Sequence, residues 1–198
     1  MIRKEFEFEC NSLVPLCDIE IKNDISTTSG EWKYDESDII TLGILHSKRI
    51  VILQREKTDK TDFWKDCLRR ELENVPVMYC LNANMEKKGI MGYIGMNRFF
   101  EDIRPFRGKN TSKDKIFDFL VKEGQVPKLL IPEDPLKGDS SLIPKKYQDE
   151  EYEDIILHNK NCLIKEYFIF MNKFWLLEKF KDKIKNGWWN YSKPFGEE

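Results

Sequence analysis

The alternation of apolar and polar positions predicts the first strands of a sheet. Residues 4–11, "KEFEFECN", alternate charged and aromatic side chains, which is the period of two typical of a half-buried strand. Residues 16–21, "LCDIEI", predict a second strand, and the polar segment 22–37 with its glycine predicts a loop. Residues 39–45 and 50–54 then predict the two arms of a hairpin joined by "HSKR".

Helical spacing follows this strand-rich region. Residues 61–74, "TDFWKDCLRRELEN", predict a helix with one apolar side, which Thr61 or Asp62 can cap. Residues 75–82, "VPVMYCLN", form a short apolar run typical of a strand buried on both faces. Three more elements are predicted after it: a short helix at 84–95, a strand at 98–106 and a helix at 113–124 closed by Gly124.

The last third of the chain combines prolines with a long apolar stretch. Four prolines predict an irregular excursion over about 124–146, and residues 148–186 predict one long helix or a broken pair. The middle of this helical region is apolar nearly all round, so we expect it to be buried. The order of elements favours an α/β fold, a mixed β-sheet flanked by helices on both faces. The length of 198 residues favours a single domain.

Composition narrows the class of protein. The chain is 40% hydrophobic and carries 33 basic against 35 acidic residues, so a local basic patch would have to provide any binding of nucleic acid. Its five cysteines are an odd number without CxxC spacing, which favours reduced thiols over disulfides or a zinc site of that type. Neither a signal peptide nor a long apolar span is visible, so we expect a soluble, cytoplasmic protein without a membrane partner.

The first candidate for chemistry is the pair Asp18 and Glu20. In a strand these alternate positions share one face, together with Lys22. Two carboxylates on a central strand can share divalent cations, which neutralise the repulsion between them. The alternative is an edge strand whose charged groups point into water, with Lys22 as the counter-charge.

Two further groups of polar residues interrupt apolar surroundings. Asn82, Asn84 and Glu86 come just beyond the short apolar strand, where open α/β sheets place ligands. The same residues can instead cap a helix and occupy its first turn. His158 and Asn159 interrupt the apolar C-terminal region, which predicts either a site or a core histidine with satisfied hydrogen bonds.

These motifs resemble those of the RNase H-like 3′–5′ exonuclease superfamily, the DEDD nucleases. Its first motif, D-x-E on the first core strand, is matched by Asp18 and Glu20. Its second motif reads "YNAxFEK" in an uncharacterised branch often associated with RecB-like nucleases, and "YCLNANMEK" supplies Asn82 and Glu86. "FEDIRPFRG" resembles the strand that follows this second motif in the superfamily. The resemblance covers roughly residues 13–180 and implies one RNase H-like nuclease domain over residues 1–198.

The third motif of the superfamily is matched only in part. It consists of a tyrosine or histidine with an aspartate a few residues later, inside a late helix. "LHNKNCL" has this form but places Asn161 or Cys162 at the acid position. Glu151 or Asp154 is one possible replacement, since Tyr147 with Glu151 has a Y-x-x-x-acid spacing. Otherwise the protein is a weak or inactive relative.

The resemblance implies a metal-dependent nuclease that hydrolyses single-stranded ends of nucleic acid with two Mg²⁺ or Mn²⁺ ions. Asp18 would bridge both ions, while Glu20 would hold the ion that prepares the attacking water. Glu86 would hold the ion that stabilises the leaving 3′ oxygen. His158 would orient or deprotonate the water. The substrate-binding residues would be Asn82, Lys87, Arg104 and Arg107, although the basic ones also fit a solvated surface.

Two other functions fit the same residues. A nuclease of the restriction-endonuclease type would use Glu20-Ile21-Lys22 with an upstream acid, Glu7 or Glu9, and would need Lys22 for catalysis. A non-catalytic domain that binds nucleic acid or a protein partner would keep the fold without the chemistry, and the missing third acid favours it. Binding of divalent metal separates this last alternative from both nucleases.

Overall fold

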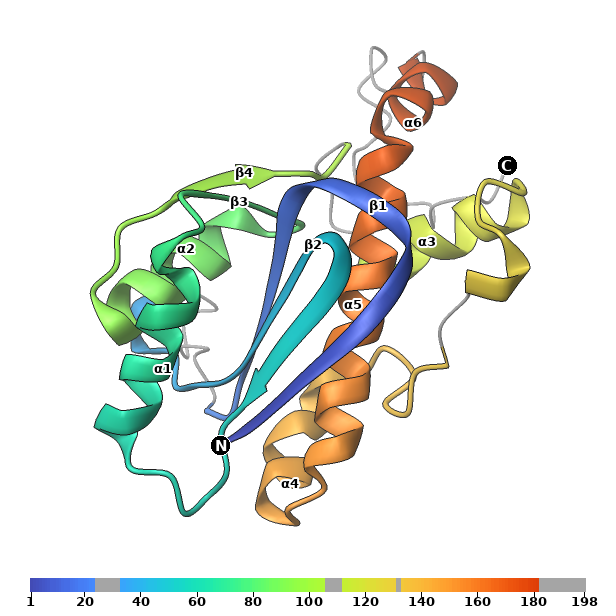
Figure 1. The fold of residues 1–198 in the computed structure, drawn as a ribbon. Helices are drawn as coiled ribbons and strands as arrows, with labels where there is room; N and C mark the ends of the chain where they lie inside the picture. Colours follow the sequence, from blue (N-terminus) through green and yellow to red (C-terminus); the bar gives the residue numbers. More distant parts are fainter. Residues whose placement is uncertain (24–32, 106–111, 131–132, 182–198) are drawn as a thin grey trace.

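The computed structural model describes residues 1–23, 33–105, 112–130 and 133–181 (Figure 1). In these ranges the sheet has four strands in the order β2-β1-β3-β4, with the following bounds: β1 Ile2–Ile21, β2 Ile39–Gln54, β3 Val77–Cys80 and β4 Phe99–Asp102. β2 is antiparallel to β1, whereas β3 is parallel to both β1 and β4. β1 therefore lies inside the sheet, between β2 and β3.

The first two predicted strands form one long strand, and the predicted hairpin is wrong. Residues 39–54 are continuous in β2, and both halves of β2 pair with β1 instead of with each other; Leu16, for example, pairs with Leu45. Register shifts on either side of Ser12 let the two-stranded ribbon bend, and it arches over in Figure 1. The four residues of "HSKR", 46–49, are exposed in the middle of β2, where Ser47 pairs with Ser12. The hydrophobic pattern of each half of β2 was a local signal, but each half pairs with β1, which is a contact between distant segments.

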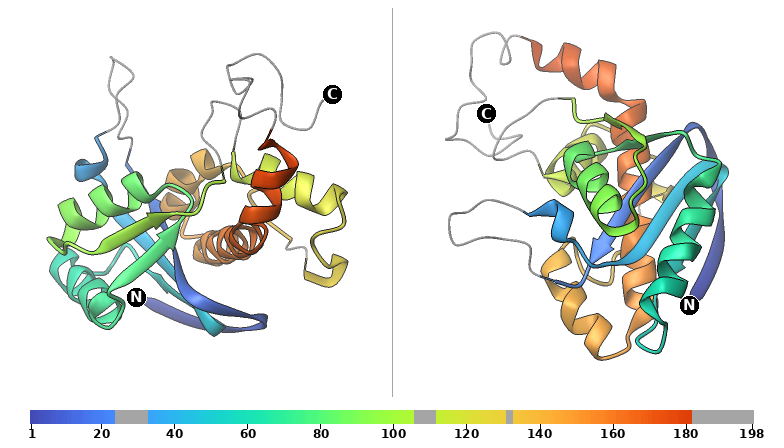
Figure 2. Two further views of the ribbon diagram at one scale, coloured as in Figure 1. Left: turned by 90° about the horizontal axis from the view of Figure 1, so that it is seen from above. Right: turned by 90° about the vertical axis from the view of Figure 1, so that its left-hand side faces the viewer.

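Helices cover both faces of the sheet, as the order of elements predicts (Figure 2). On one face, α1 (Thr61–Glu73) and α2 (Ala83–Ile94) enclose an apolar cluster with β1, β2 and β3. On the other face, α3 (Lys113–Lys122) and α5 (Tyr152–Met171) enclose a second cluster. The predicted α/β class is thus confirmed, and the arrangement is consistent with an RNase H-like fold.

Helix boundaries agree with the sequence pattern, but the predicted cap of α1 is wrong. The N-cap of α1 is Lys60, which makes no capping hydrogen bond through its side chain. The Thr61 hydroxyl instead accepts a hydrogen bond from the Arg55 guanidinium at 2.8 Å. Gly124, with a φ of 70°, follows α3 in the left-handed conformation expected of a glycine after a helix.

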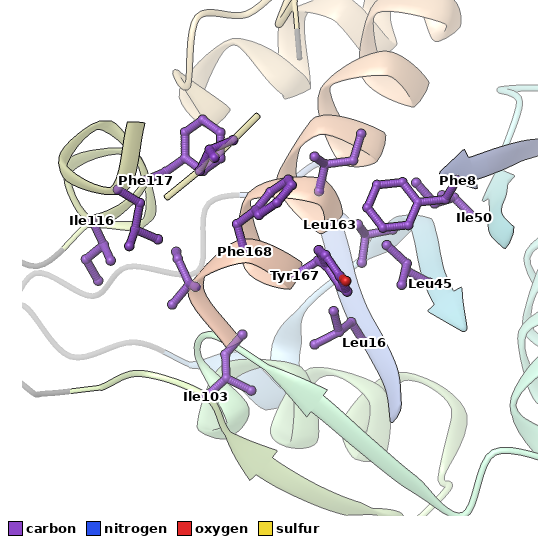
Figure 3. Close-up of a cluster of buried hydrophobic side chains, with 14 of the residues drawn as sticks. Phe8, Leu16, Leu45, Ile50, Ile103, Ile116, Phe117, Leu163, Tyr167 and Phe168 are labelled. Atoms are coloured by element: carbon purple, nitrogen blue, oxygen red, sulfur yellow. The ribbon is translucent and has the colours of Figure 1, made fainter. Parts of the chain in front are cut away.

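Helix α5 is buried against the sheet, which explains why it is apolar nearly all round. Leu163, Tyr167 and Phe168 project into the cluster that contains Phe8 and Leu16 (Figure 3). The Phe8 and Tyr167 rings meet edge to face with centroids 5.0 Å apart, a favourable aromatic arrangement. Polar side chains on the sheet-facing side of α5 are therefore buried beside β1.

The C-terminal helical region is a broken pair. α5 ends at Met171, and Asn172 separates it from α6 (Lys173–Lys179). The Asn172 side-chain amide donates a hydrogen bond to the carbonyl of Phe168 at 2.9 Å, which satisfies one of the last carbonyls of α5. The end of the predicted helical region, from residue 182, lies outside the described residues.

The proline-rich excursion is irregular, as predicted, and carries short helical turns. These are the 3-10 turns η2 (Lys128–Leu130) and η3 (Ser140–Leu142) and the helix α4 (Ile143–Gln148); the predicted loop after β1 likewise contains the 3-10 turn η1 (Tyr34–Glu36). The Asp134 carboxylate accepts hydrogen bonds from the backbone N–H groups of Leu136 and Gly138, which orders the excursion before η3. Among the described residues, no helix is long and apolar enough to cross a membrane.

Candidate metal centre

Two carboxylates project from the central strand into the protein. Asp18 and Glu20 are each only 6% exposed, and β1 is paired on both sides, so the edge-strand alternative is wrong. Lys22 does not continue their alternation, because a register shift separates Glu20 from Ile21. Its ammonium group lies 3.0 Å from the Asp38 carboxylate. The strand therefore presents two carboxylates without the predicted lysine.

Gly43 makes room for a third polar side chain beside these carboxylates. It pairs with Asp18 across the two strands, and a Cβ atom at Gly43 would lie 1.9 Å from Oδ1 of Asn159. The absence of a side chain therefore lets α5 approach β2 at this point. The Asn159 amide nitrogen donates to Asp18 at 2.9 Å and to Glu20 at 3.4 Å. Asn159 thus holds the two carboxylates side by side.

A third carboxylate reaches the same place from α2. Glu86 lies in the first turn of this helix and is 4% exposed. β3 runs parallel to β1 with Tyr79 opposite Leu16, so residues that follow β3 lie beside the end of β1. The structure therefore brings Glu86 to Asp18 and Glu20, as the resemblance implies, and their catalytic roles stay predictions.

A fourth carboxylate, which the sequence analysis missed, comes from α5. Glu166 is 1% exposed and lies one helical turn after Cys162. Cys162 and Glu166 have the x-x-x-acid spacing considered for the third motif, with a thiol in place of the tyrosine. The sequence signal for this acid is its position four residues after Cys162, in a segment that the apolar pattern otherwise predicts to be buried.

The four carboxylates line one cleft with a volume of about 690 Å³. The other lining groups come from β1, α2, α3, the proline-rich excursion and α5; they include Asn82, Met85, Lys113, Ser140, Ile143 and Cys162. A cleft of this size accommodates a small organic group such as a nucleotide.

Lys113 supplies the positive charge inside the cleft. It is the first residue of α3, and its ammonium nitrogen lies 3.1 Å from Asp18 and 3.2 Å from Glu166. Burial lowers the pKa of Lys113, but Asp18 and the other acidic groups outweigh burial and hold this pKa well above its usual range. Lys113 is therefore a stable cation that partly neutralises the carboxylates.

The electrostatics of the cleft fit additional cations. Burial raises the pKa of Glu86, and the charges of Glu166 and Asp18 raise it further. Burial and the charge of Asp18 likewise raise the pKa of Glu20 to about 8. Among the described residues, one carboxylate oxygen of Glu86 and one of Glu166 are buried without a hydrogen-bond partner. Buried oxygens without partners are costly, and hard divalent cations bind such oxygens.

His158 is buried beside Glu20 and is not part of the cleft wall. Its Nδ1 lies 2.9 Å from Asp134, and its Nε2 lies 3.8 Å from Glu20. Burial lowers the pKa of His158, but the hydrogen bond to Asp134 and the contacts with Cys162 and Glu20 together outweigh burial, and the resulting pKa is about 11. His158 consequently keeps its proton near neutral pH in this state, which does not fit the implied role of removing a proton from water.

The two positions proposed for the third motif point in different directions. The Asn161 side chain donates a hydrogen bond to the carbonyl of Glu133 at 2.6 Å and lines a different hollow. Cys162 lines the cleft with the four carboxylates. The alternative acids Glu151 and Asp154 both form ion pairs with Lys146, and neither lines the cleft.

Of the predicted substrate-binding residues, the structure places only some at the cleft. Asn82 lines the cleft, whereas Lys87 is exposed on α2 and does not line it. The Arg104 guanidinium is paired with the Asp102 carboxylate at 2.9 Å. Arg107 lies outside the described residues.

Comparison with known proteins supports the fold and gives no family. No protein-family model matches the chain, and no curated protein matches it. Among solved structures, the family B DNA polymerase from the hyperthermophilic archaeon Pyrobaculum calidifontis is similar, with a TM-score of 0.50 and 13% sequence identity. The similarity covers 85% of this chain and 24% of the polymerase, so the chain spans about a quarter of that protein's length. In fold, this chain is therefore similar to part of a family B DNA polymerase.

Proposed function

We propose that the cleft hydrolyses phosphodiester bonds of nucleic acid, in the manner of a 3′–5′ exonuclease acting on single-stranded ends. The observation that carries this proposal is a cleft with four buried carboxylates; two of them keep an oxygen atom without a hydrogen-bond partner in the part of the chain that the structure describes. The similarity in fold to a DNA polymerase supports nucleic acid as the class of substrate.

In this proposal, the cation ligands are the four cleft carboxylates: Asp18, Glu20, Glu86 and Glu166. Bound Mg²⁺ or Mn²⁺ would supply an activated water and stabilise the leaving oxygen. Asn159 keeps Asp18 and Glu20 in position through its amide hydrogen bonds. Lys113 balances their charge until cations bind, after which its ammonium group can interact with a substrate phosphate.

His158 has a different role in this proposal from the one that the resemblance implies. Its proton is stabilised by Asp134, and its Nε2 faces Glu20. His158 therefore positions Glu20 and does not act as the general base.

One observation favours a second candidate, the non-catalytic binding domain. Lys113 already places a positive charge between Asp18 and Glu166, as expected of a site that has exchanged metal for lysine. The restriction-type alternative has weaker support, because Lys22 is paired with Asp38 and does not line the cleft.

The test is Asp18→Asn, assayed on single-stranded DNA and RNA labelled at the 5′ end, with Mn²⁺ and with EDTA. Loss of a cation ligand is expected to lower the cleavage rate by about 100-fold or more, since metal catalysis contributes several kcal/mol. Glu153→Gln is the matched control, because Glu153 is an exposed acid on the same helix as Glu166. A wild-type protein that binds Mn²⁺ without cleaving either strand would support the binding domain, and one that does not bind Mn²⁺ would contradict the proposal.

A further inference from the structure

We propose that Glu20, His158 and Cys162 form a binding site for a transition-metal ion of the Zn²⁺ class. The site adjoins the four-carboxylate cleft and shares Glu20 with it. It goes beyond the proposed hydrolysis, because it concerns a different ligand set and does not require that the chain cleave nucleic acid.

The distances between the ligand atoms are those of a small coordination site. One ligand atom from each of the three residues lies within 4.8 Å of the other two, and all three residues are buried. His158 Nε2 lies 3.6 Å from Cys162 Sγ and 3.8 Å from Glu20 Oε1. With typical zinc bond lengths, a tetrahedral site separates sulfur and nitrogen by about 3.6 Å, and nitrogen and oxygen by about 3.3 Å. The distance between His158 Nε2 and Glu20 Oε1 is about 0.5 Å longer than this ideal value, so the Glu20 carboxylate would have to shift when a metal binds.

A second observation concerns the orientation of the histidine ring. His158 Nδ1 lies 2.9 Å from the Asp134 carboxylate, which leaves Nε2 directed at Glu20 and Cys162. A metal-binding histidine almost always donates its other N–H group to such an acceptor, which orients the ring and strengthens the ligand. The backbone N–H groups that hold Asp134 in its turn make this support rigid.

The ligand types decide the class of metal. A thiol and an imidazole are soft or borderline ligands that suit Zn²⁺ and Co²⁺, whereas Mg²⁺ prefers oxygen atoms alone. His158 and Cys162 are one helical turn apart on α5, so a single helix presents both, while Glu20 comes from β1. Three protein ligands leave the fourth position for water, and the Ser140 hydroxyl lies 3.3 Å from His158 Nε2.

A bound metal and a simple hydrogen bond leave the Cys162 thiol in different states, which an experiment can distinguish. Without a metal, the Cys162 thiol and His158 form an ordinary hydrogen bond. Metal binding would displace the protons of both groups. Co²⁺ is a suitable probe, because a thiolate bound to Co²⁺ gives a charge-transfer absorption in the near ultraviolet that a hydrogen-bonded thiol does not.

The experiment titrates the full chain with Co²⁺ and follows this absorption. We expect saturation at one Co²⁺ per chain and loss of the absorption on addition of Zn²⁺. Cys162→Ser should abolish the absorption, and Cys67→Ser, which changes a thiol on α1 outside the site, should retain it. Asp134→Asn should weaken Co²⁺ binding by about 10- to 100-fold, as for other partners of a metal-binding histidine, whereas Asp139→Asn in the same excursion should not.

The outcomes separate this inference from the proposed hydrolysis. Glu86→Gln should weaken Mn²⁺ binding in the cleft and leave the thiolate absorption in place, since Glu86 is not one of the three ligands. Each variant is checked by circular dichroism for folding. A folded wild-type chain without the absorption, or an absorption that Cys162→Ser does not change, would overturn the proposed site.

Discussion

Among the individual residues of the cleft, Lys113 balances part of the negative charge of the carboxylates. It contacts Asp18 and Glu166, which come from β1 and α5. A buried carboxylate that loses its counter-charge is destabilising, whereas a bound cation can replace that charge. Substitutions in this group should therefore change the stability of the cation-free protein and its affinity for cations in different ways.

Lys113→Met tests this balance directly. The cation-free protein should lose about 3 kcal/mol of unfolding free energy, because the buried Asp18 carboxylate loses its counter-charge. Mn²⁺ affinity should rise, since the ammonium group no longer competes for the same oxygens. Urea unfolding in EDTA and calorimetric titration with Mn²⁺ measure the two effects. Lys115→Met, an exposed lysine of the same helix, is the control, and equal stability of the two variants would contradict the prediction.

Glu166→Gln tests the acid that the sequence analysis missed. Burial raises the pKa of Glu166 to about 8, so the group is largely neutral at pH 7 without cations, and the neutral amide should change cation-free stability little. Mn²⁺ affinity should fall by about 10-fold or more, because an amide cannot supply the negative charge. Calorimetry against the Glu153→Gln control measures this difference. Unchanged Mn²⁺ affinity would remove Glu166 from the site.

At the scale of elements, the contact between β2 and α5 positions the site. Gly43 leaves the space that Asn159 fills, and Asn159 in turn holds Asp18 and Glu20. A side chain at Gly43 would also lie 2.8 Å from Leu163, so the helix could not keep its distance from the strand. The geometry of the carboxylates therefore depends on the packing of a helix more than a hundred residues later in the chain.

Gly43→Ala should consequently destabilise the protein by about 1–3 kcal/mol, the usual cost of overpacking a core. It should also weaken Mn²⁺ binding, because Asn159 is displaced from the carboxylates. Thermal unfolding and calorimetry measure the two effects. In the double variant with Asn159→Ala, the loss of stability should be smaller than the sum of the single losses, since the clash at 1.9 Å is removed. Strict additivity would show that the two residues are not coupled.

At the scale of the whole molecule, buried ionisable groups determine how stability varies with pH. The pKa values of Glu20 and Glu166 rise from 4.5 to about 8, so the folded state keeps protons that the unfolded state releases. This stability is present below about pH 4.5 and is lost as the pH rises through 8. His158, whose pKa rises from 6.5 to about 11, acts in the same direction. Asp134, with a pKa of about 2, acts oppositely and only below about pH 4.

We therefore expect the metal-free protein to be most stable near pH 4–5 and to lose stability steadily up to pH 9. Urea midpoints in EDTA across this range measure the trend. Mn²⁺ should reduce the loss at high pH, because a cation stabilises the charged carboxylates. Glu166→Gln should flatten the dependence, since it removes one of the titrating groups. Metal-free stability that increases from pH 5 to pH 8 would contradict the assignment of buried, protonated carboxylates.

Features with a local cause can be predicted from the amino-acid sequence. Helical spacing predicted α1, α2 and α3, and the apolar run predicted β3, because amphipathic periodicity depends on neighbours within one or two turns. Asp18 and Glu20 were found because alternate strand positions share a face, and Glu86 because it follows a buried strand. These inferences need no knowledge of which distant segments come into contact.

Which elements pair and which side chains meet depends on contacts between segments that lie far apart in the chain. β2 is continuous because β1 is long enough to pair with both of its halves. The hydrophobic pattern of the β2 segment alone cannot show this pairing. Glu166 and Lys113 reach the cleft only through the packing of α5 against β1 and of α3 against α5. The same packing turns Cys162 toward the carboxylates and Asn161 away from them, because neighbouring residues on a helix point about 100° apart.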